Sequence, residues 1–222
     1  MPHLIISLDG NIGAGKSTLL AEIRKAMPTL VVVDEPVGQW TALHNAAGKN
    51  LLELFYEDKK RWAYTFQNCA ILTRLKNIQD AVAKLEDNPE TQIILTERSV
   101  LTDKYVFAEM LRDAGEMDPL EWELYDNWFS IFSTQHPVSG IIYLSTGSTT
   151  SKDRIQIRNR QGENRIQLEY LEALDAQHKK WVENTKLPVL TLSTEPGSSL
   201  EDNLQQIREF MEQLKRQSGV GI

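Results

Sequence analysis

Residues 4–20 of the chain read LIISLDGNIGAGKSTLL, and the rest of the sequence is organised around this stretch. Apolar side chains at Leu4, Ile5, Ile6 and Leu8 form a run of strand length. The residues after them match G-x-x-x-x-G-K-S/T at every fixed position, and a helix-forming segment at 18–26 follows. The stretch therefore predicts a strand, a glycine-rich loop and a helix in direct succession.

The glycine-rich loop is expected to bind phosphate. Its backbone N–H groups would point into one concavity at the positive end of the following helix, which favours an anion. In this motif the lysine, here Lys16, reaches the β- and γ-phosphates, and the hydroxyl of Ser17 helps to hold Mg²⁺. The residues expected to surround the phosphates are Gly10, Asn11, Ile12, Gly13, Ala14, Gly15, Lys16, Ser17 and Thr18.

The composition restricts the class of protein. The chain has 222 residues, enough for one large α/β domain, and no linker-like segment interrupts it. Its 24 Lys and Arg against 31 Asp and Glu argue against general nucleic-acid binding. The single cysteine, Cys69, excludes an intramolecular disulfide, and no apolar run approaches the roughly 20 residues that cross a bilayer. We expect one domain over residues 1–222 and a cytoplasmic location.

Four further runs are typical of buried parallel strands, at 30–34, 91–96, 140–144 and 187–192. Helical patterns lie between and after them, at 50–86 in two segments, 118–134, 168–181 and 200–215. This alternation predicts an α/β fold with a five-stranded parallel sheet and helices on both faces. We expect Trp122 and Trp128 to lie in the core or in helix packing.

Charged side chains directly follow two of the predicted strands. Glu35 comes after 30–34, and Glu97 and Arg98 come after 91–96. Ligands of open α/β sheets bind beyond the carboxyl ends of the strands. All three side chains are therefore expected near the phosphate loop.

The predicted helix at 50–86 carries a mixed face. Phe66, Gln67, Ala70 and Arg74 fall on one side at spacings of three and four. Polar groups among apolar neighbours require partners. By itself, such a pair more often indicates a helix-packing or surface contact than a binding site.

Four arginines, Arg154, Arg158, Arg160 and Arg165, gather within a short stretch of an acidic chain. A charge run seen alone favours a solvated helix face. Downstream of a phosphate loop, several arginines instead suit the charge that spreads over a transferring phosphoryl group.

With these residues in view, the sequence resembles the deoxyribonucleoside kinases, the family of deoxycytidine, deoxyguanosine and mitochondrial thymidine kinases. The resemblance runs from Ile5 to about Trp181. It is carried by GNIGAGKST, DEPVGQW, NLLELFYEDKKRWAYTFQ, ERSVLTDKYVFAE, GIIYL, the Arg154–Arg160 run and LEYLEAL. It implies a P-loop kinase fold with an arginine-rich lid at about 152–166. It also implies transfer of the ATP γ-phosphoryl group to the 5′-hydroxyl of a deoxyribonucleoside, with Mg²⁺.

The resemblance implies three catalytic residues, Glu35, Arg98 and Lys16. Glu35 matches the base that accepts the proton of the 5′-hydroxyl, and Arg98 matches a residue beside that hydroxyl and the incoming phosphoryl group. Glu97 and Ser17 would help to organise Mg²⁺. The lid residues matched to the donor phosphates are Arg154, Arg158 and Arg160.

The resemblance also implies an acceptor pocket. Tyr56 and Glu169 match positions that hold the sugar 3′-hydroxyl, and Gln67 matches the residue that makes paired hydrogen bonds to the base. Phe66 and Phe107 match the residues that sandwich the base. The complete set implied for the acceptor is Glu35, Trp40, Tyr56, Phe66, Gln67, Ala70, Arg74, Arg98, Asp103, Phe107 and Glu169.

Two charged positions bear on the choice of base. Arg74 and Asp103 resemble the charged pair that narrows the pocket in the deoxycytidine/deoxyguanosine branch. Such a pair donates and accepts hydrogen bonds at once, which suits an amino-substituted base better than a thymine methyl group. Ala70 also resembles the deoxycytidine kinase pattern. We therefore expect a preference for deoxycytidine, with some activity on deoxypurine nucleosides.

The chain departs from the family pattern around the lid and the donor site. Asn159 stands where the family has glycine between two arginines, and Ser148 and Thr149 replace a proline and a glutamate. The loop at 193–197 does not align cleanly, so the preference for ATP over another triphosphate donor stays open.

Two other functions are compatible with part of these features. A thymidylate kinase-like nucleoside monophosphate kinase shares the phosphate loop and lid, but Glu35 would repel its dianionic acceptor. A non-catalytic nucleotide-binding structural or regulatory subunit is disfavoured because Lys16, Ser17, Glu97 and other expected active-site residues occur together. By analogy with the family we also expect a homodimer, with the helices at 57–86 and 118–134 as candidate interfaces.

Overall fold

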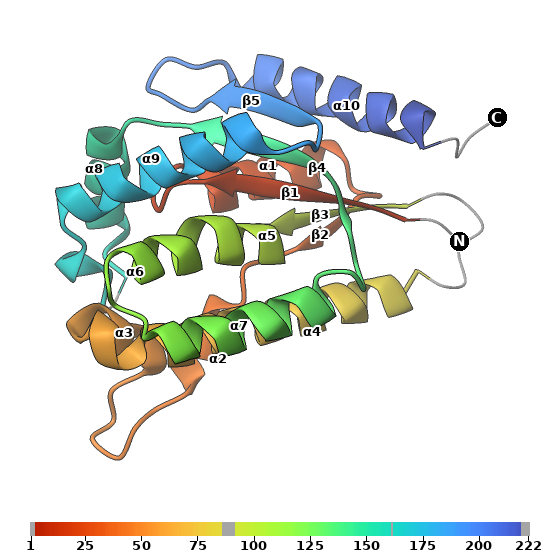
Figure 1. The fold of residues 1–222 in the computed structure, drawn as a ribbon. Coiled ribbons are helices and arrows are strands. Elements are labelled where there is room, and N and C mark those ends of the chain that lie inside the picture. Colours follow the sequence, from red (N-terminus) through yellow and green to blue (C-terminus); the bar gives the residue numbers. More distant parts are fainter. Residues whose placement is uncertain (1–2, 86–91, 161, 219–222) are drawn as a thin grey trace.

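The computed structural model describes residues 3–85, 92–160 and 162–218. Its centre is a five-stranded sheet (Figure 1), formed by β1 Leu4–Gly10, β2 Val31–Val33, β3 Ile93–Glu97, β4 Val138–Ser145 and β5 Val189–Ser193. The strands lie in the order β2-β3-β1-β4-β5, and each neighbouring pair is parallel. The predicted five-stranded parallel sheet is therefore confirmed.

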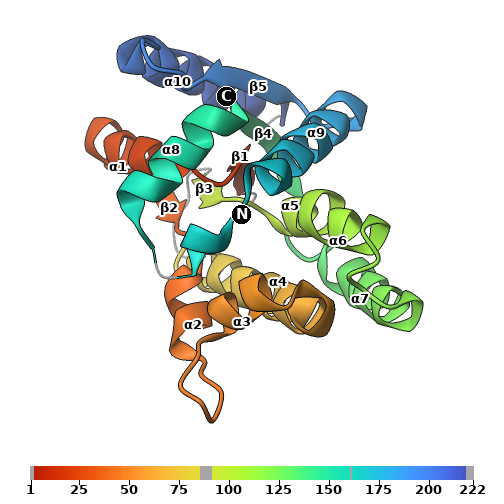
Figure 2. The ribbon, with the colours of Figure 1, turned by 90° about the vertical axis from the view of Figure 1, so that its left-hand side faces the viewer.

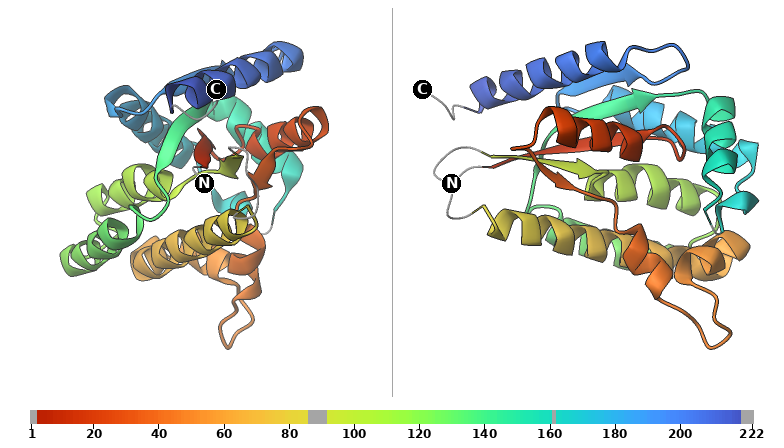
Figure 3. Two further views of the ribbon diagram at one scale, coloured as in Figure 1. Left: turned by 90° about the vertical axis from the view of Figure 1, so that its right-hand side faces the viewer. Right: turned by 180° about the vertical axis from the view of Figure 1, so that it is seen from behind.

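Helices cover both faces of this sheet, as expected. The helical elements are α1 Lys16–Ala26, α2 Val37–Ala42, α3 Leu51–Glu57, α4 Lys59–Ala83, α5 Val100–Thr102, η1 Asp103–Ala108, α6 Glu109–Asp113, α7 Pro119–Phe132, α8 Ser148–Arg158, η2 Glu163–Arg165, α9 Leu168–Asn184 and α10 Leu200–Gln217. The right-hand view of Figure 3 shows α1 and α10 on one face, whereas α9 and the helix from α5 to α6 cover the other in Figure 1. No helix of the described residues is long and apolar enough to cross a membrane.

Side chains of β1 alternate between two cores, as the geometry of a strand requires. Ile6 and Leu8 pack with residues of α1 and α10, whereas Ile5 packs with residues of α4 and α9. A third core joins α2, α3, α4 and α7 away from the sheet. Through this third core, α2, α3 and α7 pack against α4, which itself contacts β2 and β3.

The predicted helical region at 50–86 consists of two helices because two caps divide it. Asn50 and Glu53 form a capping box that starts α3, with Glu53 N donating to Asn50 Oδ1 at 2.9 Å. Asp58 ends α3 and caps α4, and its Oδ1 accepts from Arg61 N at 3.0 Å. The division places Tyr56 in the last turn of α3, close to the start of α4.

The helix after β3 widens into a π-helical segment, η1, which the sequence pattern does not predict. The amide of Gln177 in α9 donates to the backbone oxygen of Tyr105 within this segment, at 2.8 Å. The segment contains both Asp103 and Phe107, and π-helical turns frequently occur at functional sites.

The prediction that both tryptophans of α7 are packed is wrong for one of them. Trp122 is half-buried and lies against the third core, but Trp128 is 43% exposed. α7 is apolar on more than one side, so its hydrophobic pattern does not reveal which side faces the core.

Candidate active site

Two cavities meet at the carboxyl ends of the strands, the end of the molecule that faces the viewer in Figure 2. The first extends from the phosphate loop to α3 and α4. The second lies between the phosphate loop, α8 and the loop after β5. The residues that line both cavities are Gly13, Lys16, Ser17, Glu97, Arg158 and Arg160.

The phosphate loop packs tightly against α8. Gly13 has a φ of 81°, and a Cβ atom there would lie 2.3 Å from the backbone oxygen of Ser151 in α8. Only glycine fits both constraints. Of the residues predicted to surround the phosphates, Gly10, Asn11 and Ala14 line neither cavity. Asn11 instead donates to the backbone oxygen of Leu171 at 2.8 Å and so fixes the loop to α9.

Lys16 lies across the loop. Its Nζ donates to the backbone oxygens of Gly10 at 3.0 Å and Asn11 at 2.8 Å. Burial, with repulsion from Arg98, lowers the pKa of Lys16 to about 7. The hydroxyl of Ser17 donates to both carboxylate oxygens of Glu97, at 3.2 and 3.1 Å.

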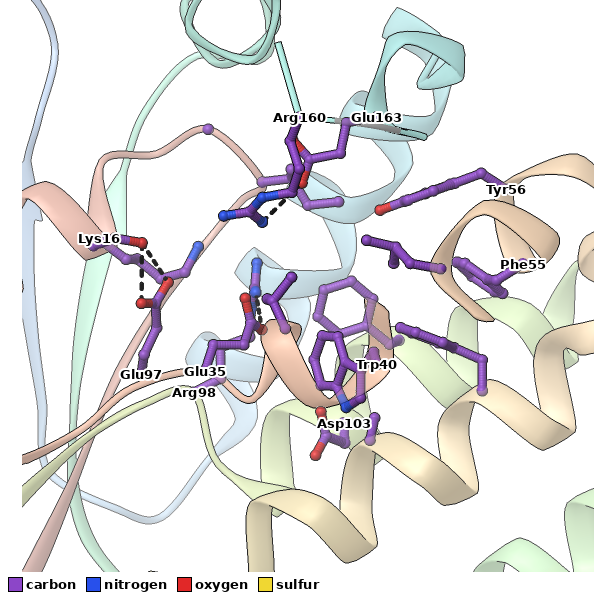
Figure 4. A pocket seen from close by; sticks show the side chains of 18 of the residues that line it. Lys16, Glu35, Trp40, Phe55, Tyr56, Glu97, Arg98, Asp103, Arg160 and Glu163 are labelled. Carbon is purple, nitrogen blue, oxygen red and sulfur yellow. Dashed lines mark hydrogen bonds and ion pairs between the residues drawn. The ribbon is translucent and has the colours of Figure 1, made fainter. Parts of the chain in front are cut away.

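Glu35 sits between two arginines. Arg98 Nη1 pairs with Glu35 Oε1, and Arg74 Nη2 lies 3.5 Å from the same oxygen. Burial alone would raise the pKa of Glu35, but the charges of Arg98 and Arg74 outweigh it and lower this pKa to about 2. Figure 4 shows Glu35 and Arg98 facing one another beside Lys16 and Glu97. The predicted strand-end residues are thus brought together.

Arg98 has a strained backbone. Its φ of 62° lies in the left-handed region, which costs a residue other than glycine about 1–3 kcal/mol and tends to occur at functional sites. The guanidinium of Arg98 also lies over the ring of Phe107, 5.0 Å from its centroid.

Aromatic rings form one wall of the first cavity. Phe55 stacks on Phe66 at a centroid distance of 4.5 Å, and Trp40 meets Phe66 edge to face at 5.2 Å. Phe107 and Ala70 also line the cavity. Phe55 is absent from the predicted site because an apolar helical position that packs in a core has no feature that marks it as a binding residue.

A buried ion pair lies beside these rings. Arg74 Nε and Nη2 donate to Asp103 Oδ2 and Oδ1 at 2.8 and 3.1 Å, and Arg74 Nη1 donates to the backbone oxygen of Glu97 at 2.6 Å. The mixed face of α4 is therefore not a surface contact. Gln67 also lines the cavity, and its buried Oε1 has no hydrogen-bond partner among the described residues.

The carboxylate near Tyr56 differs from the predicted one. Glu169 is exposed in the first turn of α9 and lines neither cavity. Glu163 in η2 is only 3% exposed and lines the first cavity with Tyr56 and Tyr170. Figure 4 shows the Tyr56 hydroxyl pointing into the cavity on the side of Glu163. Matching LEYLEAL led to Glu169, whereas the signal for Glu163 is its place among the gathered arginines, three residues after Arg160.

The arginines of the lid have different partners. Arg158 Nη2 and Arg160 Nη1 lie 2.6 and 3.0 Å from the two carboxylate oxygens of Glu163. Arg154 Nη2 instead donates to the backbone oxygen of Thr194 at 2.6 Å. Arg165 pairs with Glu57 at the surface and lines neither cavity.

The departures from the family pattern are accommodated locally. Asn159 ends α8 with a φ of 48°, a left-handed conformation that asparagine tolerates better than most residues other than glycine. α8 starts at Ser148, where the carboxylate of Glu195 accepts from Gly147 N and from Thr150 Oγ1. Residue 161 of the expected lid lies outside the described residues.

Comparison with known proteins agrees with this geometry. A family model described as deoxynucleoside kinase matches residues 6–217. The chain belongs to the deoxynucleoside kinase family. The resemblance stated from the sequence is confirmed, together with the P-loop kinase fold and the class of ATP-dependent phosphotransferases that it implies.

Three relatives of this kinase cover most of its length. A probable deoxycytidine kinase of fowlpox virus (strain NVSL) is 40% identical in an alignment 212 positions long, which covers 92% of this chain and 84% of the relative. The deoxycytidine kinase of Homo sapiens is 33% identical in an alignment 238 positions long, gaps included, which covers 94% of this chain and 91% of the relative. The mitochondrial deoxyguanosine kinase of Xenopus laevis is 33% identical in an alignment 214 positions long, which covers 86% of this chain and 81% of the relative.

Proposed function

We propose that this deoxynucleoside kinase transfers the γ-phosphoryl group of ATP to the 5′-hydroxyl of deoxycytidine, and less efficiently to that of deoxypurine nucleosides. The observation that carries the proposal is that two features line the same cavity. One is Gln67 Oε1, a buried acceptor without a hydrogen-bond partner among the described residues, and the other is the buried ion pair of Arg74 and Asp103. An exocyclic amino group would supply the hydrogen bond that Gln67 lacks, since a buried polar atom without a partner is destabilising. Relatives named as deoxycytidine and deoxyguanosine kinases support the same choice.

In the proposed complex the nucleoside occupies the first cavity and the donor triphosphate the second. Lys16 would leave the two backbone oxygens that it contacts and bind the phosphates, with Arg158 and Arg160 opposite it. Acceleration would come from positioning the two substrates and from stabilising the transferred charge, because phosphoryl transfer requires little covalent chemistry from the protein.

Glu35 would accept the proton of the 5′-hydroxyl. Both of its contacts with the arginines use Oε1, and Oε2 makes no hydrogen bond or ion pair with the described residues. Since the pKa of Glu35 is about 2, the carboxylate stays ionised near neutral pH, with one oxygen available to the acceptor. Arg98 would contact the same hydroxyl and the incoming phosphoryl group.

The pair formed by Ser17 and Glu97 fits a magnesium ion. Both side chains offer oxygen atoms within 3.2 Å of one another at the junction of the two cavities. No cluster of three or more metal-binding side chains occurs among the described residues. Mg²⁺ suits such a sparse site because it commonly takes one or two protein ligands and completes its shell with phosphates and water. When bound, it would offset the negative charge of the donor phosphates.

Tyr56 and Glu163 would hold the 3′-hydroxyl of the sugar. Burial, with the nearby Glu163 contributing, raises the pKa of Tyr56 well above its usual value, so its hydroxyl stays protonated. The pair would therefore offer one donor and one charged acceptor. A matched comparison separates the two candidate carboxylates, because Glu163→Gln should raise the KM for deoxycytidine whereas Glu169→Gln should not.

A homodimer is a further proposal. Leu120, Leu124, Trp128 and Ile131 follow one another along one side of α7 and are 63%, 40%, 43% and 54% exposed. Such a stripe suits burial against a second copy of the chain. One domain with a lid at about 152–166 and a cytoplasmic location stay predictions from the sequence.

One experiment tests the proposed substrate. The four natural deoxyribonucleosides compete in one reaction with Mg-ATP, and each 5′-monophosphate is measured. We expect deoxycytidine monophosphate to predominate, followed by the deoxypurine products. A predominance of thymidine monophosphate would contradict the proposed preference for deoxycytidine. The absence of every product would contradict the proposed catalysis.

A further inference from the structure

Glu163 occupies an unusual position between the two substrate cavities. Glu163 lines the first cavity and not the second. Its two partners, Arg158 and Arg160, each line both cavities. The two ion pairs measure 2.6 and 3.0 Å, and each carboxylate oxygen receives one arginine. An anion at the proposed acceptor site thus pairs with two cations that are proposed to bind the donor phosphates.

This arrangement has an electrostatic consequence. Glu163 is 3% exposed, and among the described residues its ion pairs are with these two arginines. If triphosphate drew the arginines away, a buried carboxylate would be left unpaired, which is strongly unfavourable. Donor binding without an acceptor therefore carries the free-energy cost of leaving the Glu163 carboxylate unpaired.

An acceptor sugar changes this balance. Its 3′-hydroxyl would donate a hydrogen bond to Glu163, and Tyr56 lines the cavity beside the same carboxylate. Hydrogen bonds from these groups would replace the arginines as partners. Arg158 and Arg160 would then be free to turn toward the phosphates.

We propose that Glu163 is a positioning residue that makes tight binding of the phosphoryl donor depend on the 3′-hydroxyl of the acceptor. The inference rests on the proposed acceptor site and extends it. By linkage, the donor tightens the binding of the nucleoside by the same factor. The kinase would thus hold its phosphate-binding arginines back until a suitable acceptor is present.

The test measures the dissociation constant of Mg²⁺-bound β,γ-imido-ATP on the full chain by calorimetry. It is measured alone, with saturating deoxycytidine, and with saturating 2′,3′-dideoxycytidine, which lacks the 3′-hydroxyl. We expect deoxycytidine to tighten donor binding by about fivefold or more, a typical coupling, and dideoxycytidine to have a much smaller effect. Equal effects of the two nucleosides would overturn the proposal.

Variants give an independent result. Glu163→Gln removes the charge that restrains Arg158 and Arg160, so donor binding should already be tight without nucleoside and should not respond to deoxycytidine. A residue with a merely structural role would weaken donor binding when replaced, and a folded Glu163→Gln protein with weakened binding would therefore overturn the proposal. Glu172→Gln, at an exposed glutamate of α9, is the matched control and should keep the coupling.

The outcomes separate this inference from the proposed function. Wild-type enzyme that phosphorylates deoxycytidine but shows no dependence of donor affinity on the 3′-hydroxyl overturns the inference alone. Wild-type enzyme that phosphorylates no deoxyribonucleoside overturns the function on which the inference rests. If Glu163→Gln does not fold, the comparison of the two nucleosides on the wild type decides.

Discussion

The buried pair of Arg74 and Asp103 should respond very differently to single and double substitution. In Asp103→Ala the guanidinium loses two hydrogen bonds, of 2.8 and 3.1 Å, and keeps the backbone oxygen of Glu97 and the longer contact with Glu35. Removing one partner of a buried pair costs about 3–5 kcal/mol. For a chain of 222 residues this lowers Tm by about 10 °C.

The two single variants should not be equivalent. Arginine cannot release its proton in a protein, so Asp103→Ala strands a permanent charge. Burial raises the pKa of Asp103, so in Arg74→Met the remaining carboxyl group can become neutral by binding a proton. We expect Arg74→Met to be the less destabilising of the two, and the difference to grow as pH falls from 7 to 5.

The double variant completes the cycle. Arg74→Met with Asp103→Ala leaves no unpaired charge in the pair, so its loss of stability should be at least about 2 kcal/mol smaller than the sum of the single losses. Urea unfolding of the four proteins, followed by circular dichroism, measures this coupling. Additive losses would refute the reasoning, as would greater damage from Arg74→Met than from Asp103→Ala. The double variant should also raise phosphorylation of thymidine relative to deoxycytidine.

Three further results are expected. Glu35→Gln should lower kcat by about 10²-fold or more because the acceptor loses its base, and near wild-type turnover would remove Glu35 from that role. Burial lowers the pKa of His178 from 6.5 to about 3, so the unfolded chain binds a proton below pH 6.5 that the folded chain excludes. Stability should therefore fall by about 2 kcal/mol between pH 7.5 and pH 5, and urea unfolding of His178→Leu should lack this part of the loss. Leu124→Glu should convert the proposed dimer to monomer in analytical ultracentrifugation without a large change in Tm, and an unchanged mass would exclude α7 from the interface.

The sheet and the phosphate side of the site could be predicted because their signals are local. Residues 4–20 contain a strand, a loop and a helix start in one continuous pattern, and parallel strands necessarily bring their carboxyl ends to one edge. Glu35, Glu97 and Arg98 lie at or just beyond the carboxyl ends of their strands, and the structure brings them together. Element ends shifted by a few residues, as with the strand predicted at 140–144 and observed as β4 Val138–Ser145.

The remaining features depend on contacts between distant segments. Glu163 lies in a short turn without hydrophobic periodicity, and in the structure it pairs with Arg158 and Arg160, which line the same cavity. Within the π-helical segment η1, the backbone oxygen of Tyr105 accepts a hydrogen bond from Gln177, which is 72 residues away in the sequence. Trp128 belongs to a helix that is apolar on several sides, where periodicity does not identify the exposed one.

Arg74 links two properties of the enzyme that appear separate. Besides its pair with Asp103, its guanidinium donates to the backbone oxygen of Glu97 at 2.6 Å, directly where β3 presents the carboxylate that faces Ser17. A substitution that widens the base pocket at Arg74 therefore also releases the main chain under the proposed metal ligand. Substitutions of Arg74 that broaden the range of nucleosides should therefore also slow turnover. Substitutions of Ala70 or Phe55 should broaden this range without slowing turnover, because these residues line the cavity but make no hydrogen bond to Glu97.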